Sequence, residues 1–120
     1  MGALFDCLSA ALEKKAEDPA ILDLRGISSV ADFFVILTGN SQRQVQAISD
    51  EVEMAFRNRG ARDYNVEGRG NCSWVLLDFA NVVVHVFHRP ARVFYAVENL
   101  WSDAGVVGPD VVLSWGLVGK

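Results

Sequence analysis

Apolar residues recur along the chain at two different spacings, and each spacing predicts a type of element. Over residues 3–16 they lie three or four positions apart, which is typical of a helix with one buried side. Residues 20–24 and 31–39 are short, nearly continuous apolar runs, and such runs favour buried strands. The first third of the chain therefore predicts one helix followed by two strands.

A second helix is predicted between Ser41 and Gly60. Ser41 has Gln44 three positions later, which is a capping-box pattern, and one apolar stripe follows at helical spacing. Gly60 is a natural C-terminal stop for a helix. The polar stretch 62–68 that comes next predicts a weaker strand.

Residues 74–87 predict a β-hairpin with Ala80 and Asn81 at its turn. In this register Trp74 lies opposite Phe87, and alternate residues face opposite sides. One side, which we expect to be core, is apolar throughout: Val75, Leu77, Phe79, Val82, Val84 and Val86. The second side carries Trp74, Leu76, Asp78, Val83, His85 and Phe87. A second apolar side is either covered by a helix or the tail, or left as an interface for a partner or a second copy, and the pattern alone leaves these open.

Pro90 suits the first turn of a last helix, which we expect to run to about Ala104. Its buried stripe is predicted to contain Val93, Phe94, Val97, Leu100, Trp101 and Ala104. Arg92 and Tyr95 lie on another side of it. After Gly105 no period is clear, so we predict a domain over residues 1–105 and a tail over 106–120. The tail's apolar residues are expected to dock on the domain: Val111, Val112, Leu113 and Trp115.

The predicted order of elements indicates an α/β (α+β) fold, with a mixed sheet of about five strands flanked by helices on one or both faces. At 120 residues, with 51% hydrophobic and 22% charged residues, the chain suits one folded domain. Its net charge of −4 disfavours nonspecific binding to DNA and favours a basic protein partner. No apolar run reaches the roughly 18 residues of a membrane span, and the first residues do not resemble a secretory signal. We therefore expect a cytoplasmic protein.

The sequence offers little for catalysis. Its two histidines, His85 and His88, lie in one predicted strand, and neither metal ligands nor a cofactor motif cluster anywhere. The turn Thr38-Gly39-Asn40-Ser41 suggests an alternative function, nucleotide binding, because a Gly/Ser turn before a helix binds phosphate in nucleotidyltransferases. Such enzymes also need paired carboxylates, whereas the adjacent Asp50 and Glu51 diverge on a helix. We expect no enzyme, and keep as the alternative a nucleotide-binding or nucleotidyltransferase-type enzyme that uses this turn.

Several motifs carry a family likeness in the same order and spacing. They are the segment 30–52, Glu67-Gly68, WVLLDFANVVVHVF at 74–87 and RVFYAVENLW at 92–101. Together they resemble the ribosomal silencing factor family, also called iojap-like proteins, over roughly residues 5–104. The turn Phe79-Ala80-Asn81 departs from the family's usual aromatic residue, Gly and Asp.

The resemblance implies a nucleotidyltransferase-like fold without the catalytic carboxylates. It also implies a translation repressor that binds the large ribosomal subunit through its ribosomal protein number fourteen, and that blocks joining of the small subunit. Free members are often homodimers. The partner-binding residues expected on this chain are Trp74, Leu76, Asp78, His85 and Phe87 from the hairpin, with Arg92 and Tyr95 from the last helix.

Overall fold

The computed structural model describes residues 2–29, 31–97, 99 and 104–118, with the side chains of 114–118 left aside. In chain order its elements are α1 (Gly2–Glu13), β1 (Glu17–Asp23), β2 (Phe33–Gly39), α2 (Gln42–Asn58), β3 (Asn65–Glu67), β4 (Trp74–Asp78), β5 (Val82–His88), α3 (Arg89–Tyr95), β6 (Gly105–Val107) and α4 (Pro109–Val118). The predicted mixed α/β class is confirmed. The sheet has six strands, because residues predicted as the start of a tail form β6.

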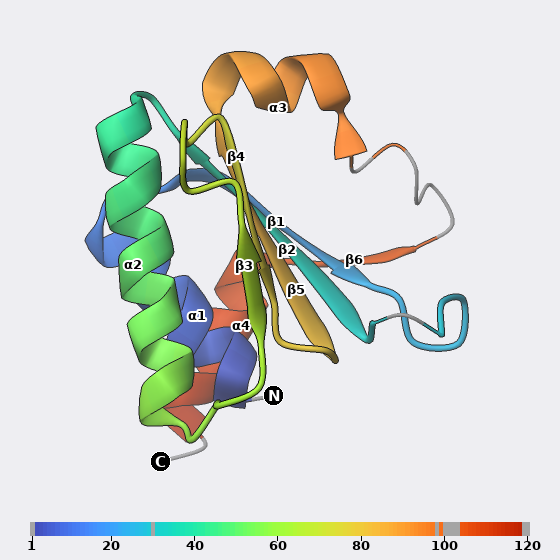
Figure 1. The fold of residues 1–120 in the computed structure, drawn as a ribbon. Coiled ribbons are helices and arrows are strands. Elements are labelled where there is room, and N and C mark those ends of the chain that lie inside the picture. The colour runs from blue at the N-terminus through green and yellow to red at the C-terminus, as the bar shows by residue number, and fades with distance from the viewer. Residues whose placement is uncertain (1, 30, 98, 100–103, 119–120) are drawn as a thin grey trace.

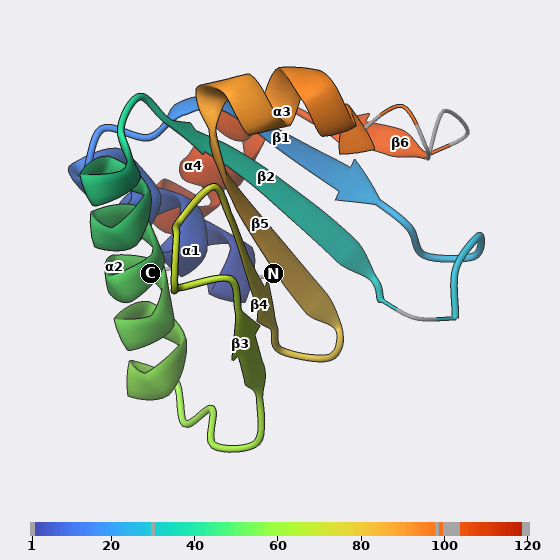
Figure 2. The same cartoon turned by 45° about the horizontal axis from the view of Figure 1, so that its top comes forward.

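The strands lie in the order β3-β4-β5-β2-β1-β6, as Figure 1 shows. The central pair, β2 and β5, is parallel, and all other neighbours are antiparallel. Helices α1, α2 and α4 cover one face, and α3 lies across the other side where β2 and β5 end (Figures 1 and 2). The two helices that follow the parallel strands therefore leave the sheet on opposite sides.

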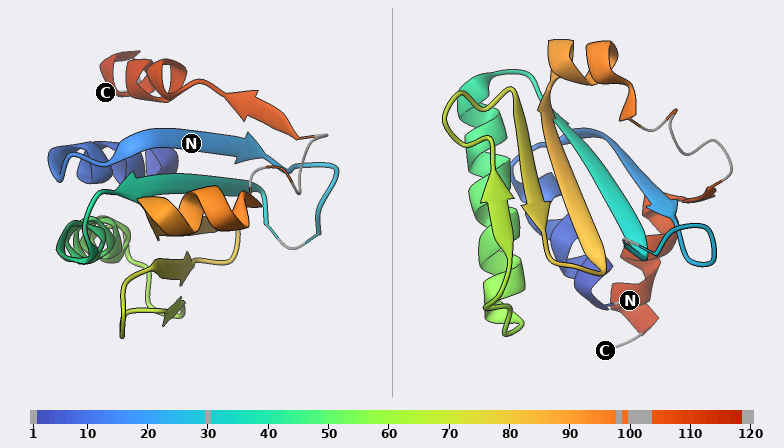
Figure 3. Two further views of the ribbon diagram at one scale, coloured as in Figure 1. Left: turned by 90° about the horizontal axis from the view of Figure 1, so that it is seen from above. Right: turned by 45° about the vertical axis from the view of Figure 1, so that its right-hand side comes forward.

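The larger core lies between the sheet and the helices α1, α2 and α4, whose arrangement around the sheet is seen in two further views in Figure 3. Gln44 links this layer to the sheet. Its backbone N–H donates to Ser41 Oγ at 3.0 Å, which confirms the predicted N-cap. Its side-chain oxygen accepts from the Asn40 N–H at 2.7 Å, and its amide nitrogen donates to the carbonyls of Lys14 and Lys15 at 3.1 and 2.9 Å. The start of α2 therefore holds the chain that leaves α1.

The hairpin has the predicted register, with Trp74 opposite Phe87. At its turn the Phe79 N–H donates to the Val82 carbonyl at 3.0 Å, and Ala80 has a φ of +72°. Asp78 supports this left-handed residue, because its Oδ1 accepts from the Ala80 N–H at 2.9 Å. The six residues predicted as the core face are all buried.

The last predicted helix is wrong in length and in its buried stripe. Helix α3 ends at Tyr95, because Ala96 adopts a left-handed conformation with φ +45°. Val93 and Phe94 are 75% and 80% exposed, whereas Val97 turns inward and is buried. Leu100 and Trp101, predicted in the same stripe, lie outside the described residues.

The segment predicted as a tail is part of the packed structure. Strand β6 pairs with β1, and α4 contacts α1 and β1. Val112 is buried and Val111 is half-exposed, so docking on the body is confirmed for Val112. The side chain of Trp115 is outside the described part.

Candidate partner-binding surface

The second side of the hairpin is only partly open. Trp74, Leu76 and Asp78 on β4 are half-buried, and Leu76 lies opposite His85 in the ladder. Phe87 is fully buried and His85 is 5% exposed. The expectation that these last two side chains face a partner is therefore corrected. The rest of the chain covers them.

A second, smaller core explains this cover. Phe87 packs in it with Leu22, Leu24, Ile36 and Val97, and Trp74 and Ala91 lie against it. The residues that follow β5 thus fold back over this face of the sheet and bury its central strands. The side chains that β4 presents on the same face stay partly accessible.

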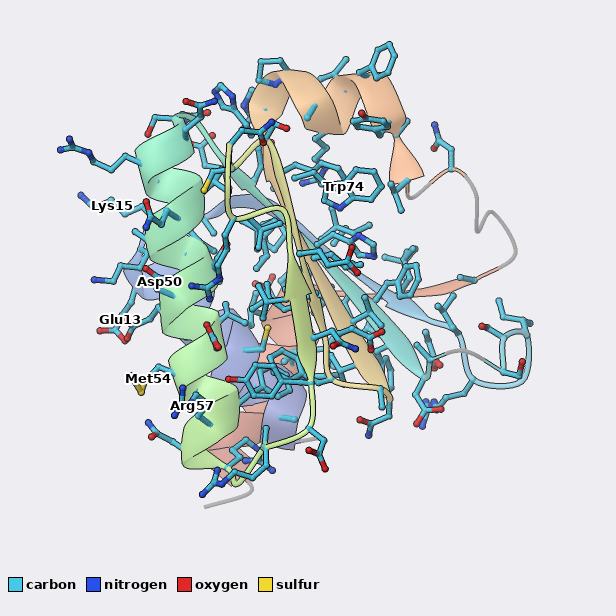
Figure 4. The ribbon with its side chains drawn as sticks, viewed as in Figure 1. Glu13, Lys15, Asp50, Met54, Arg57 and Trp74 are labelled. Atoms are coloured by element: carbon cyan, nitrogen blue, oxygen red, sulfur yellow. The ribbon has the colours of Figure 1, made fainter. Side chains whose placement is uncertain are left out.

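Trp74 lies between the buried and the open parts of this side. Its ring centroid is 4.9 Å from that of Phe87 and 4.8 Å from that of Tyr95 on α3. Its indole Nε1–H donates to His85 Nδ1 at 3.1 Å. Figure 4 shows Trp74 below α3, on the side of the sheet away from α2. The indole is thus fixed by two rings and one hydrogen bond.

His85 is neutral near physiological pH. Burial lowers its pKa to about 4, because a charged imidazole is poorly solvated there. Since Nδ1 accepts the Trp74 N–H, the proton of the neutral ring resides on Nε2. Nε2 is buried and has no hydrogen-bond partner among the described residues.

Arg92, expected to contact a partner, is held within the structure. Its guanidinium donates to Thr38 Oγ1 at 2.6 Å and to the Asp18 carbonyl. Arg89, which the sequence did not indicate, donates to Glu17 at 2.6 Å and to Asp18 at 2.9 Å. Both arginines thereby hold α3 against β1, at the end of the sheet where the central strands β2 and β5 finish.

Phe94, like Val93, is a surface residue that the sequence pattern had placed in a buried stripe. Its ring meets Tyr95 edge-on at 5.1 Å, and Tyr95 is 49% exposed. Leu76 and Trp74 are alternate residues on one side of β4, and Trp74 contacts Tyr95, which contacts Phe94. We call these four side chains the Trp74 surface. No signal in the sequence indicates this surface, because it depends on the left-handed conformation of Ala96, which hydrophobic spacing does not reveal.

Comparison with known proteins gives the family. Residues 3–114 match the family described as "Ribosomal silencing factor during starvation". The chain belongs to the ribosomal silencing factor family. It is 44% identical over 107 residues to the ribosomal silencing factor RsfS of Halalkalibacterium halodurans, covering 89% of this chain and 92% of that one. It is 46% identical over 98 residues to RsfS of Bacillus subtilis, covering 82% and 83%.

A solved structure of a family relative has the same fold. The crystal structure of a Bacillus halodurans protein is 41% identical and superposes with a TM-score of 0.76 over 86% of this chain and 93% of that one. The predicted family resemblance is therefore confirmed, and with it a role as a ribosomal silencing factor.

In this family member, backbone N–H groups at the Thr38–Ser41 turn and in the first turn of α2 already donate to side chains of the same chain. The Asn40 N–H and the Gln44 N–H both donate to side chains, and a Cβ on Gly39 would lie 3.0 Å from Val45 Cγ2. Asp50 is paired with Arg69 at 3.0 Å.

Over the described residues, no group of three or more His, Cys, Asp or Glu side chains is placed to hold a metal ion. The same part of the chain contains no helix suited to crossing a membrane.

Proposed function

We propose that this protein represses translation by binding the large ribosomal subunit through its ribosomal protein number fourteen. Once bound, it blocks joining of the small subunit sterically, without catalysis, in the cytoplasm. The Trp74 surface makes the contact. The observation that carries the proposal is the family match over residues 3–114.

The residue types of the Trp74 surface support a protein partner. Residues of the kinds enriched at binding hot spots, Trp74 and Tyr95, lie in contact and are accessible. Buried Phe87 and His85 support them from below and do not touch the partner. We therefore propose a revised set of contact residues. Trp74, Leu76, Asp78 and Tyr95 remain in it, and Phe94 is added.

The charge of the chain supports a basic partner. A net charge of −4 is repelled by the ribosomal RNA and attracted by a basic ribosomal protein. Electrostatics of this kind orient the encounter more than they strengthen it. Arg92 contributes indirectly, because it holds α3, and so Tyr95, in place.

Self-association is a second use of the same surface. An exposed apolar surface of this kind is also a candidate homodimer interface when the protein is free. Size-exclusion chromatography of the wild type and of Trp74→Ala checks this, since loss of a dimer in the variant identifies the surface as the self-interface.

The experiment for the proposed function is co-sedimentation with separated ribosomal subunits on sucrose gradients. We expect the protein in the large-subunit fraction and absent from the small-subunit fraction. Adding small subunits afterwards should give fewer joined ribosomes than in the protein's absence. A protein that stays at the top of both gradients contradicts the proposal, and calorimetry with nucleoside triphosphates and magnesium then tests the nucleotide alternative.

A further inference from the structure

The one polar atom of the Trp74 side chain is used inside the protein. Tryptophan has a single hydrogen-bonding group, the indole N–H, and here it donates to His85 Nδ1 at 3.1 Å. The ring is also placed against Phe87 and Tyr95, at 4.9 and 4.8 Å between centroids. Trp74 thus has no hydrogen bond left to offer a partner, although its ring remains accessible.

His85 provides the acceptor at a cost. Its ring lies 4.7 Å from Phe34 and is parallel to Phe87, so it is held as an aromatic side chain would be. Its Nε2 is buried and unpartnered among the described residues. A buried donor without an acceptor is unfavourable, and a phenylalanine here would pack without that penalty. Packing alone therefore does not account for an imidazole at this position, whereas the bond from Trp74 to Nδ1 does.

We propose that His85 is a positioning residue, whose Nδ1 holds the Trp74 indole in one orientation so that Trp74 meets the partner through its ring alone. This rests on the proposed function, because it concerns the same surface. The ring face takes an apolar side chain, or the cation of a lysine or arginine, from the partner protein. A basic ribosomal protein offers both. Fixing the indole before binding removes the entropy cost of ordering it at the interface.

Two substitutions separate the hydrogen bond from the packing. His85→Phe keeps an aromatic ring and removes the acceptor. His85→Asn shortens the side chain but keeps an acceptor oxygen near the place of Nδ1. If His85 only packs, the Phe variant is the milder change; if it positions Trp74, the Asn variant is the milder one for binding.

The free protein gives a readout that needs no ribosome. The indole N–H resonance of Trp74 is identified among three tryptophans by its loss in Trp74→Phe. We expect it at a hydrogen-bonded shift, with a rigid heteronuclear NOE, in the wild type and in His85→Asn. In His85→Phe we expect it to move toward the free indole position and to become more mobile. An unchanged resonance in a folded His85→Phe protein overturns the proposal.

Binding to large subunits gives the second readout. Since ordering one mobile side chain at an interface costs about 1 kcal/mol, we expect His85→Phe to bind about fivefold more weakly than the wild type, and His85→Asn to be weakened less than that. In a Trp74→Phe background, His85→Phe should cause no further loss, because the residue through which it acts has already lost its N–H. Independent losses that multiply in the double variant contradict a positioning role.

The two proposals fail differently. If the wild type does not bind large subunits, the proposed function fails, and the indole resonance still shows whether His85 positions Trp74. If the wild type binds and His85→Phe binds equally well, positioning by His85 is wrong and the proposed function stands.

Discussion

Acidification should destabilise this protein through His85 at pH values still above the pKa of His85 in the folded state. An unfolded chain protonates histidine at its ordinary pKa of 6.5, whereas in the folded protein burial lowers the pKa of His85 to about 4. Between these two values the unfolded state binds more protons, so the free energy of unfolding falls as the pH falls. The contribution of the neutral, buried His85 to the free energy of unfolding is therefore constant above pH 6.5 and fully lost below pH 4.

The size of the effect follows from the shift. One pKa unit corresponds to about 1.4 kcal/mol, so a shift of this width removes about 3 kcal/mol of stability across the window. That is a large share of the roughly 5–15 kcal/mol by which a typical domain is stable. Charging His85 also removes the acceptor at Nδ1, so the hydrogen bond from Trp74 is lost in the same step.

The assay is urea denaturation at several pH values between 7 and 4, followed by circular dichroism, for the wild type and for His85→Asn. The carboxylates titrate in both proteins, so the difference between their stability curves isolates the imidazole. We expect the wild type to lose about 3 kcal/mol more than the variant over this range. Parallel curves would refute the assignment of His85 as a buried neutral histidine.

Three further substitutions, the first with a matched control variant, test other parts of the structure. Gly68→Ala places a Cβ 2.0 Å from the Trp74 carbonyl oxygen at φ +90°, so thermal denaturation should show a loss above about 2 kcal/mol; Gly60→Ala, at φ +98° with nothing within 4 Å, should lose only about 1 kcal/mol. Gln44→Leu removes the bonds from α2 to the end of α1 and should lower the free energy of urea unfolding by about 1–2 kcal/mol, whereas an unchanged value would exclude that link. Phe94→Ser, at a side chain that is 80% exposed, should change stability by less than about 0.5 kcal/mol and still weaken binding to large subunits in a sedimentation titration.

The hairpin was predictable because the apolar pattern of its strands and the position of its turn indicate the same register. A register shift by one residue would move every core side chain of β4 and β5 to the other side, and only one register makes a side wholly apolar. The turn then follows, although Ala80 is an unfavourable residue at φ +72°. Asp78 compensates by accepting from the Ala80 N–H, a local contact that hydrophobic spacing does not reveal.

The cover of the second side was not predictable from the same pattern. Residues after Pro90 fit a long helix by spacing, but the chain leaves the helix at Ala96, and Val97 packs on the buried side of β5. The consequence is that Phe87 is core and Phe94 is surface, the reverse of the expectation. Likewise β6 is too short to give a pattern, and exists because β1 offers it an open edge.

The most direct test of the central claim compares substitutions at two surface sites on opposite sides of the sheet. Trp74→Ala removes the centre of the Trp74 surface, while Met54→Ala changes an exposed residue of α2, on the other face (Figure 4). Both proteins are first shown to be folded by circular dichroism, then sedimented with purified large subunits. We expect Met54→Ala to bind as the wild type does and Trp74→Ala to bind about thirtyfold more weakly, as loss of a hot spot worth about 2 kcal/mol implies. A folded Trp74→Ala protein that co-sediments as the wild type does would contradict it.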